Sequence, residues 1–427
     1  MIANKNVESK TIGLYRLSFL NFIILKKTFS FLLILAFYFS CSTDELNESQ
    51  PIVTEPVTEP VTNNPNSTTN TNTGSNTVSD TNSTPTTFDR QAMLIFWADS
   101  IIIPSQNKFQ SDLIEFSNSV NDFSYDPSLS TLNTVRENWF TAYKSWQHIE
   151  MFNIGKAEEI NYGVRMNVYP SNIERIELNI SNDDNDIEHP NDYPAQGLPA
   201  VDYLLHGIGN NDSEIIEKFT SENSKYLDYL IVLSNKMIEL TDDVVSDWDE
   251  FYRNVFISST DNTATSSINK LTNDFIYYYE KGFRANKFGI PAGVFSGSVL
   301  LDRVEAYYKR DISKILALEA IDAISNFFNG IPYGGNSANS GLSFKEYIEF
   351  LETVKNDVPL GQLILDQLTE ARSNIISLED DFTIQLENKK LEMLTTYDVI
   401  QVAVVFLKVD MLQALNINVD YIDADGD

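Results

Sequence analysis

Residues 196–209 read QGLPAVDYLLHGIG, a short apolar segment framed by glycines. Gly197 allows the chain to reverse direction, and the fixed backbone angle of Pro199 suits the first turn of a helix. Gly207 is the residue type that most often follows the end of a helix. The pattern therefore predicts a short helix from about residue 199 to residue 207.

Two polar side chains lie within this predicted helix, four residues apart. Because residues at this spacing share one face, the Asp202 carboxylate and the His206 imidazole should project side by side. Val201, Leu204 and Leu205 would cover the other side. The pair is suited to bind a metal or to act as acid and base; alternatively, Asp202 stabilises the positive end of the helix dipole and His206 caps the other end.

The same segment resembles the signature of the imelysin family, whose usual form is Gly-x-His-x-x-Glu followed by Tyr-Leu-Leu and Gly. Gly197 holds the first position, Pro199 stands where the family has His, and Asp202 stands where it has Glu. Proline offers no metal-binding atom, whereas Asp202 can still bind a hard cation. The resemblance implies a ligand site at this segment, formed by Gly197, Pro199, Asp202 and His206.

Further stretches resemble the family in the same order along the chain, from about residue 89 to residue 427. They are residues 135–155, residues 289–293 followed by 304–308, and the acidic end at 421–427. The resemblance implies an all-α fold of two helical bundles, about 88–255 and 256–427, with the central segment at their junction.

Helical periodicity runs through the chain from residue 88, because apolar residues recur there at spacings of three and four. The predicted helices are residues 89–120 with a kink at Pro104, 132–152, 213–248, 298–329, 343–355, 360–378 and 383–415. Residues 161–194 and the turn-rich 287–293 are predicted to be loops. The last helix is predicted to bury a face made of Leu394, Val399, Val402, Val405, Phe406, Val409 and Leu412.

The charge balance constrains the partners. The 427 residues carry 61 acidic and 30 basic side chains, a formal net charge of −31. Such a surface repels the phosphate backbone, which excludes nucleic acid as a partner, and it attracts cations or basic proteins. Acidity that simply keeps a secreted protein soluble explains the same balance. With one cysteine and three histidines, a metal site here would be built mainly on carboxylates.

The N-terminus has the pattern of a bacterial lipoprotein. Lys26 and Lys27 precede an apolar run at residues 28–40 that is too short to span a bilayer, and Ser40 stands directly before Cys41. We predict a signal peptide over residues 1–40 and a lipid on Cys41. Residues 41–87 are rich in Thr, Asn and Pro and are predicted to be a disordered tether. The expected location is the cell envelope, at the outer membrane.

Two further carboxylates are candidates for the same site. Glu150 lies four residues after Trp146, near the inward face of its helix, where a carboxylate needs a partner. Glu305 lies near the 287–293 loop and would meet Asp202 if the two halves face each other. A surface pairing of Glu305 with nearby basic residues, Arg303 or Lys309, is the alternative.

Three functions are compatible with these observations. The first is a non-enzymatic, membrane-anchored binding protein, for which the resemblance to imelysins implies a role in iron acquisition. In it Asp202, Glu150 and Glu305, with His206, line a pocket for iron, calcium or an iron-bearing ligand. The second is a metallopeptidase, the activity after which the family is named, which Pro199 makes the weaker hypothesis. The third is an acidic surface scaffold that docks a protein of an uptake system.

Overall fold

The computed structural model describes residues 87–183, 186–221 and 224–421. The predicted signal peptide, the lipidated Cys41, the tether up to residue 86 and the acidic end from residue 422 lie outside the described residues. The described residues all belong to one compact unit, which begins at Asn82.

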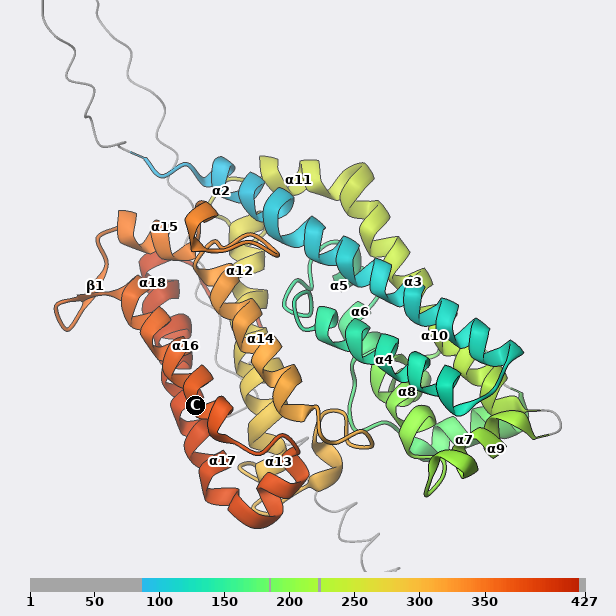
Figure 1. Cartoon of the computed structure of the whole chain (residues 1–427). Coiled ribbons are helices and arrows are strands. Elements are labelled where there is room, and N and C mark those ends of the chain that lie inside the picture. Colours follow the sequence, from blue (N-terminus) through green and yellow to red (C-terminus); the bar gives the residue numbers. More distant parts are fainter. Residues whose placement is uncertain (1–86, 184–185, 222–223, 422–427) are drawn as a thin grey trace, which may run out of the picture. The chain divides into compact units, whose positions relative to one another are not determined.

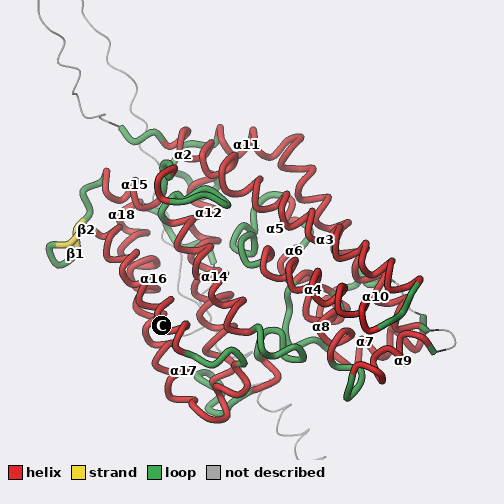
Figure 2. Tube along the Cα trace, viewed as in Figure 1, coloured by secondary structure: helices red, strands yellow, loops and turns green. Residues whose placement is uncertain are grey.

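The described chain is all-α, as predicted, and its helices form two groups (Figures 1 and 2). Within the described residues the only strands are β1 (Val354–Lys355) and β2 (Val358–Pro359), which pair as an antiparallel hairpin. None of the helices in this part of the chain has the length and apolar character needed to cross a membrane.

The first group is built on two long helices, α3 (Ile103–Tyr125) and α10 (Lys225–Asp247), with α4 (Leu129–Trp146) packed on α3. Buried rings such as Phe109 and Trp146 pack in its core in a tilted arrangement, with 5.4 Å between their centroids. The remaining elements of this group are α2 (Arg90–Trp97), the π-helix η1 (Ala98–Ile102), α5 (Lys156–Glu159), α6 (Tyr162–Met166), α7 (Ile173–Asn182), η2 (Pro190–Ala195), α8 (Gly197–His206), α9 (Asp212–Thr220), the π-helix η3 (Trp248–Tyr252) and α11 (Arg253–Ser258).

The second group is built on α14 (Ser313–Phe328), α16 (Leu360–Ser377) and α17 (Phe382–Val405). Helix α16 packs against both others and buries Leu360, Ile364 and Leu368 on one face. The remaining elements are α12 (Ser267–Tyr277), the π-helix η4 (Tyr278–Gly289), α13 (Ile290–Ala292), η5 (Leu301–Arg303), η6 (Ser337–Asn339), α15 (Phe344–Phe350), the π-helix η7 (Phe406–Met411) and α18 (Leu412–Leu415).

Aromatic rings join the two groups. Trp97 of α2 lies 5.1 Å from Phe327 of α14 and 4.6 Å from Phe344 of α15, measured between ring centroids. Phe152, which follows α4, packs edge-on against Phe327 as well. This end of the junction is apolar, so polar chemistry between the groups has to lie elsewhere along it.

Several predicted boundaries are confirmed and others are wrong. Helix α16 lies within one residue of its prediction, and Pro104 stands in the first turn of α3, directly after π-helix η1. Residues 161–194, predicted to be a loop, contain α6, α7 and η2. Helix α7 forms because Ile176 and Ile180 share a buried face and Asn172 caps its first turn.

The predicted helix over residues 213–248 is interrupted. It consists of α9 and α10, and the side chain of Ser224 accepts a hydrogen bond from the backbone N–H of Leu227 to start the second helix. A serine in this position competes with the helical hydrogen bonds of the preceding turn, which is why the apolar spacing alone did not reveal the break.

Two predictions for the segment before α14 are wrong. Residues 287–293 are helical up to Ala292, because Pro291 lies in the first turn of α13, where its missing N–H costs nothing. Residues 298–312, predicted to be helical, form one short turn and an irregular loop in which Ala306 and Arg310 adopt left-handed backbone angles (φ 56° and 67°). Glu305 therefore lies on a loop and not on a helix.

The apolar face predicted for the last helix is wrong at three positions. Val402, Val405 and Val409 are 41%, 43% and 55% exposed. The chain departs from helical angles at Lys389 and passes through the π-turns of η7, so the inward face rotates relative to an uninterrupted α-helix. The buried positions are instead Met393, Tyr397, Ile400, Ala403, Val404, Leu407 and Met411.

Candidate functional site

Helix α8 begins at Gly197, two residues before its predicted start. Gly197 has φ +77°, and a Cβ built there would lie 2.4 Å from the backbone oxygen of Met166. Only glycine fits this close approach, so the role of Gly197 is to shape the backbone. Pro199 lies in the first turn of α8 and presents only carbon atoms to its surroundings.

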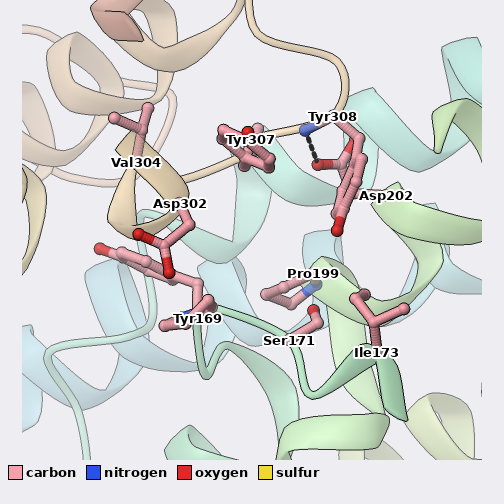
Figure 3. A pocket seen from close by; sticks show the side chains of 11 residues that line it. Tyr169, Ser171, Ile173, Pro199, Asp202, Asp302, Val304, Tyr307 and Tyr308 are labelled. Carbon is pink, nitrogen blue, oxygen red and sulfur yellow. Dashed lines mark hydrogen bonds between the residues drawn. The ribbon is translucent and has the colours of Figure 1, made fainter. Parts of the chain in front are cut away.

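Asp202 is fully buried in α8 and binds the loop that follows Glu305. Its Oδ2 accepts the backbone N–H of Tyr308 at 2.8 Å, and its Oδ1 accepts the backbone N–H of Lys309 at 3.0 Å. Figure 3 shows the Asp202 carboxylate beside the Tyr308 backbone. Asp202 is thus an anchor between α8 and the loop, a role that neither interpretation of the sequence included.

His206 completes this anchor. Its Nδ1 lies 3.1 Å from Oδ1 of Asp202, and its ring packs at 5.2 Å from the ring of Trp139. The predicted side-by-side arrangement of Asp202 and His206 is confirmed by this contact. A small cavity of about 190 Å³ lies beside α8 and is lined by Tyr169, Pro170, Ser171, Ile173, Pro199, Asp202, Asp302, Val304, Ala306, Tyr307 and Tyr308 (Figure 3).

Glu305 enters a second polar network, across the junction of the two helix groups. It is 3% exposed, and its Oε2 accepts the ammonium of Lys287 at 2.5 Å. Its Oε1 accepts amide N–H groups from Asn167 at 3.0 Å and from Gln147 at 3.2 Å. The predicted surface pairing with Arg303 or Lys309 is wrong, because Glu305 is buried against Lys287.

Glu150 joins the same network through Asn167. The Asn167 amide donates to Oε1 of Glu150 at 2.9 Å, and its own oxygen accepts the hydroxyl of Tyr143 at 2.7 Å. Burial raises the pKa of Glu150; the ammonium of Lys287 lowers this pKa, and the neighbouring Glu305 raises it further. One buried ammonium therefore serves two buried carboxylates.

Tyrosines surround this pair of carboxylates. Burial, followed by the charges of Glu150 and Glu305, raises the pKa values of Tyr169 and Tyr278 well above the ordinary range. The pKa of Tyr143 is raised by the same causes. All three therefore stay neutral phenols at physiological pH.

A larger cavity of about 320 Å³ opens at Glu150, and we call it the Glu150 cavity. Besides Glu150 its walls contain two more carboxylates, Glu158 and Asp274. Burial, together with the charges of Glu158 and Asp420, raises the pKa of Asp274 to about 8. The complete lining is Glu150, Met151, Asn153, Glu158, Asn161, Gly163, Val164, Asn167, Val168, Tyr169, Asp274, Tyr277, Tyr278, Lys281, Gly282 and Asn286.

A sequence profile described as Imelysin (Peptidase M75) matches residues 102–401 of the chain. This chain belongs to the imelysin family. Its fold is similar to that of a putative iron-regulated protein A precursor from Parabacteroides distasonis ATCC 8503, with a TM-score of 0.64 and 16% identity over 78% of this chain and 97% of that one. An imelysin-like protein from Psychrobacter arcticum 273-4 is similar with a TM-score of 0.60, at the same identity and coverage. The curated proteins include no match.

In this imelysin, the three predicted metal-binding carboxylates do not form one cluster. Glu150 and Glu305 meet at Asn167, whereas both oxygens of Asp202 accept backbone N–H groups of the loop. Over residues 87–183, 186–221 and 224–421, no group of three or more His, Cys, Asp or Glu side chains is placed to hold a metal ion. The site is therefore better described as a carboxylate pair with a neighbouring cavity.

Sequence reasoning missed the residues that hold this pair together. Lys287 is 2% exposed, although a lysine in a turn-rich segment is expected to face solvent. Its Nζ donates to Oε1 of Gln147 at 2.8 Å as well as to Glu305. The only available signal was position, because Lys287 lies two residues before the imelysin-like residues 289–293. Asn167 gave no signal, because it lies in the segment 161–194 that was predicted to be a loop. Its acidic partners, Glu150 and Glu305, lie in other segments of the chain.

Proposed function

We propose that the protein is a non-enzymatic binding protein of the cell envelope, which holds a cation or a cation-bearing ligand at Glu150. One observation carries the proposal: Lys287, the one lysine that is fully buried in the described part of the chain, pairs with Glu305 and also acts electrostatically on Glu150, next to the Glu150 cavity. This leaves one negative charge without a full partner. A positive group entering the cavity would supply that partner.

The electrostatics of burial support this proposal. A buried carboxylate that lacks a partner is costly, and it responds by holding its proton more tightly. The pKa of Glu150 is raised for this reason. A cation in the cavity would supply an opposite charge and so favour the ionised form of Glu150, in competition with the proton that Glu150 otherwise holds.

The imelysin name suggests a peptidase, but the residues favour binding without catalysis. Metal-assisted hydrolysis needs a metal-bound water next to an acid or base. Pro199 replaces the histidine of the family signature and offers no ligand atom. Asp202 already accepts two backbone N–H groups through its two oxygens. Neither side chain is therefore free to hold a catalytic metal.

The context of iron acquisition and membrane anchoring is part of the same proposal. It is supported by the fold similarity to the P. distasonis protein, which is described as iron-regulated, and by the lipoprotein pattern that ends at Cys41. We propose that Cys41 is lipidated and holds the protein at the outer membrane. Metabolic labelling with an alkyne fatty acid should label the full chain and not the Cys41→Ala variant; equal labelling of both would contradict the anchor.

Calorimetric titration tests the ligand site. The full chain in mild detergent is titrated separately with calcium chloride, ferric citrate, haem and n-butylamine, and the titrations are repeated with Glu150→Gln. We expect at least one probe to bind and its affinity to drop in Glu150→Gln. Glu159→Gln is the matched control, because Glu159 is exposed on α5 and does not line the cavity.

If no probe binds, or if binding is indifferent to Glu150, the proposed site is wrong. The remaining function is then an acidic scaffold that docks another protein, and the salt dependence of this docking tests it. A docked protein would be retained by the full chain at low salt and released at high salt, because exposed charges are screened within about 10 Å at 0.1 M salt.

A further inference from the structure

We infer that the Glu150 cavity receives the ammonium group of an organic amine and not a bare metal ion. This inference rests on the proposed function, since it names the class of ligand that the same site would take. Four features of the cavity lead to it: its ligand atoms, its size, its aromatic wall and an unsatisfied hydroxyl.

The ligand atoms argue against a bare metal ion. A hard cation such as calcium is held by six to eight oxygens at about 2.3–2.6 Å. The described residues bring no three acidic, histidine or cysteine side chains together for such a shell. Glu305 already accepts Lys287, Asn167 and Gln147, so it is not available as a second ligand beside Glu150.

The size of the cavity fits an organic molecule. Small-molecule sites have volumes of about 300–1,000 Å³, and the Glu150 cavity has about 320 Å³. Its walls mix carboxylates with apolar and aromatic side chains, such as Val164 and Tyr277. A carbon skeleton that ends in a positive group matches this mixture. The skeleton would contact the apolar and aromatic side chains, and the positive group would contact a carboxylate.

Tyrosine rings add attraction for an organic cation. Tyr169, Tyr277 and Tyr278 line the same cavity as Glu150. Tyr169 and Tyr278 stay protonated because burial raises the pKa of each, which makes them poor metal ligands. A neutral ring still attracts an ammonium by its negative face.

Tyr278 supplies a hydrogen-bonding group that lacks a partner. The residue is 5% exposed, and its hydroxyl lies near Glu150 without making a hydrogen bond of ordinary geometry to any described residue. A buried hydroxyl in this state costs free energy. An ammonium has three donors and no acceptor, so it can donate to Glu150 and to the Tyr278 oxygen together.

Helix η4 carries Tyr278, Lys281 and Gly282 of the cavity wall, and its conformation is unusual. It is a π-helix of 12 residues, and π-turns are frequent at functional sites. A Cβ at Gly282 would lie 2.6 Å from the ring of Tyr278, so glycine leaves room for that ring. Lys281 lines the cavity too, and its ammonium lies 3.2 Å from the carboxylate of Glu280, which also pairs with Lys408 at 3.0 Å.

Titration with matched probes tests the inference on the full chain in mild detergent. The probes are n-butylamine, its uncharged counterpart 1-butanol, and calcium chloride. We expect n-butylamine to bind more tightly than 1-butanol and calcium to leave the cavity unoccupied. Glu150→Gln should weaken amine binding about 10- to 100-fold, since a hydrogen bond to a charged group contributes about 1.5–3 kcal/mol. Tyr278→Phe should weaken it about 3- to 10-fold, and Glu159→Gln should not change it.

The outcomes separate this inference from the proposed function. Calcium or ferric citrate binding that depends on Glu150, without amine binding, would overturn the amine and leave the cation site standing. Loss of binding by all cations would overturn both. If Glu150→Gln does not fold, as judged by its circular dichroism, then equal affinities for n-butylamine and 1-butanol, or an unchanged affinity in Tyr278→Phe, are sufficient to overturn the amine.

Discussion

The carboxylate of Asp202 accepts the backbone N–H of Tyr308 at 2.8 Å. The two residues belong to different helix groups, and Tyr308 lies in the loop that carries Glu305. A buried carboxylate thus does for this loop what a capping residue does for a helix end, by accepting N–H groups that have no partner in their own segment. The position of Glu305 at the site depends on this contact.

Asp202→Asn should therefore destabilise the protein and loosen the loop. Asparagine keeps one oxygen acceptor but places an NH₂ group against a backbone N–H, so one buried donor loses its partner. The expected cost is about 1.5–3 kcal/mol of unfolding free energy. Hydrogen exchange should show faster exchange at Tyr308 and Lys309, and the exposed Asp302→Asn is the control. Unchanged exchange at both amides would show that Asp202 does not hold the loop.

Gly197→Ala should be much more destabilising than a glycine substitution on a neighbouring helix. At Gly197 the new Cβ would meet the Met166 oxygen, and its backbone angle is one that alanine disfavours. We expect a loss of about 3 kcal/mol or more. Gly163 lies in α6 with open space around its Cβ position, so Gly163→Ala should be neutral or slightly stabilising. Similar melting temperatures for the two variants would refute the strained role of Gly197.

The Lys287–Glu305 pair should behave as a coupled unit in a double-mutant cycle. Lys287→Met leaves Glu305 and Glu150 without their shared ammonium, and removal of one partner from a buried pair costs about 3–5 kcal/mol. Lys287→Met combined with Glu305→Gln removes one of the two carboxylates left without an ammonium, so the double variant should be more stable than Lys287→Met alone. Urea denaturation measures both; additive losses would mean that the two side chains act independently.

The fold was largely predictable from local patterns, and the exceptions have tertiary causes. Helix α16 was predicted to within one residue because its buried positions repeat regularly and no outside contact alters them. Residues 304–308 have helical composition, yet they form a loop since Asp202 takes the backbone N–H groups of Tyr308 and Lys309. A contact across 106 residues of sequence cannot be deduced from the spacing of apolar residues within one segment.

The acidic residues of the candidate site could be predicted from the sequence, but the residues that pair with them could not. Glu150 was expected to face inward and to need a partner, and that partner is Asn167. Lys287 could not be assigned, because its burial depends on Glu305 and Gln147, which lie on other elements. A carboxylate among apolar positions indicates that it needs a hydrogen-bond or charge partner. Which residue becomes that partner depends on the tertiary structure.

Asp274 should make the stability of the protein depend on pH. Burial, followed by the charges of Glu158 and Asp420 and partly offset by Lys270, raises the pKa of Asp274 from 3.8 to about 8. The folded protein therefore holds this proton more tightly than the unfolded chain does. By linkage, the contribution of Asp274 to stability is most favourable at acidic pH and is lost as the pH rises from about 4 to about 8.

Asp274→Asn cannot ionise, so it should escape that loss. The variant should gain stability relative to the natural protein between pH 5 and pH 9, by roughly 2–4 kcal/mol once solvent screening is allowed for. Urea denaturation at pH 5, 7 and 9 measures the difference, with Glu159→Gln as a control whose offset should not vary with pH. If the curves for Asp274→Asn and the natural protein stay parallel, Asp274 ionises as readily in the folded protein as in the unfolded chain. Asp274 would then carry its negative charge at neutral pH, as one of the carboxylates that line the Glu150 cavity.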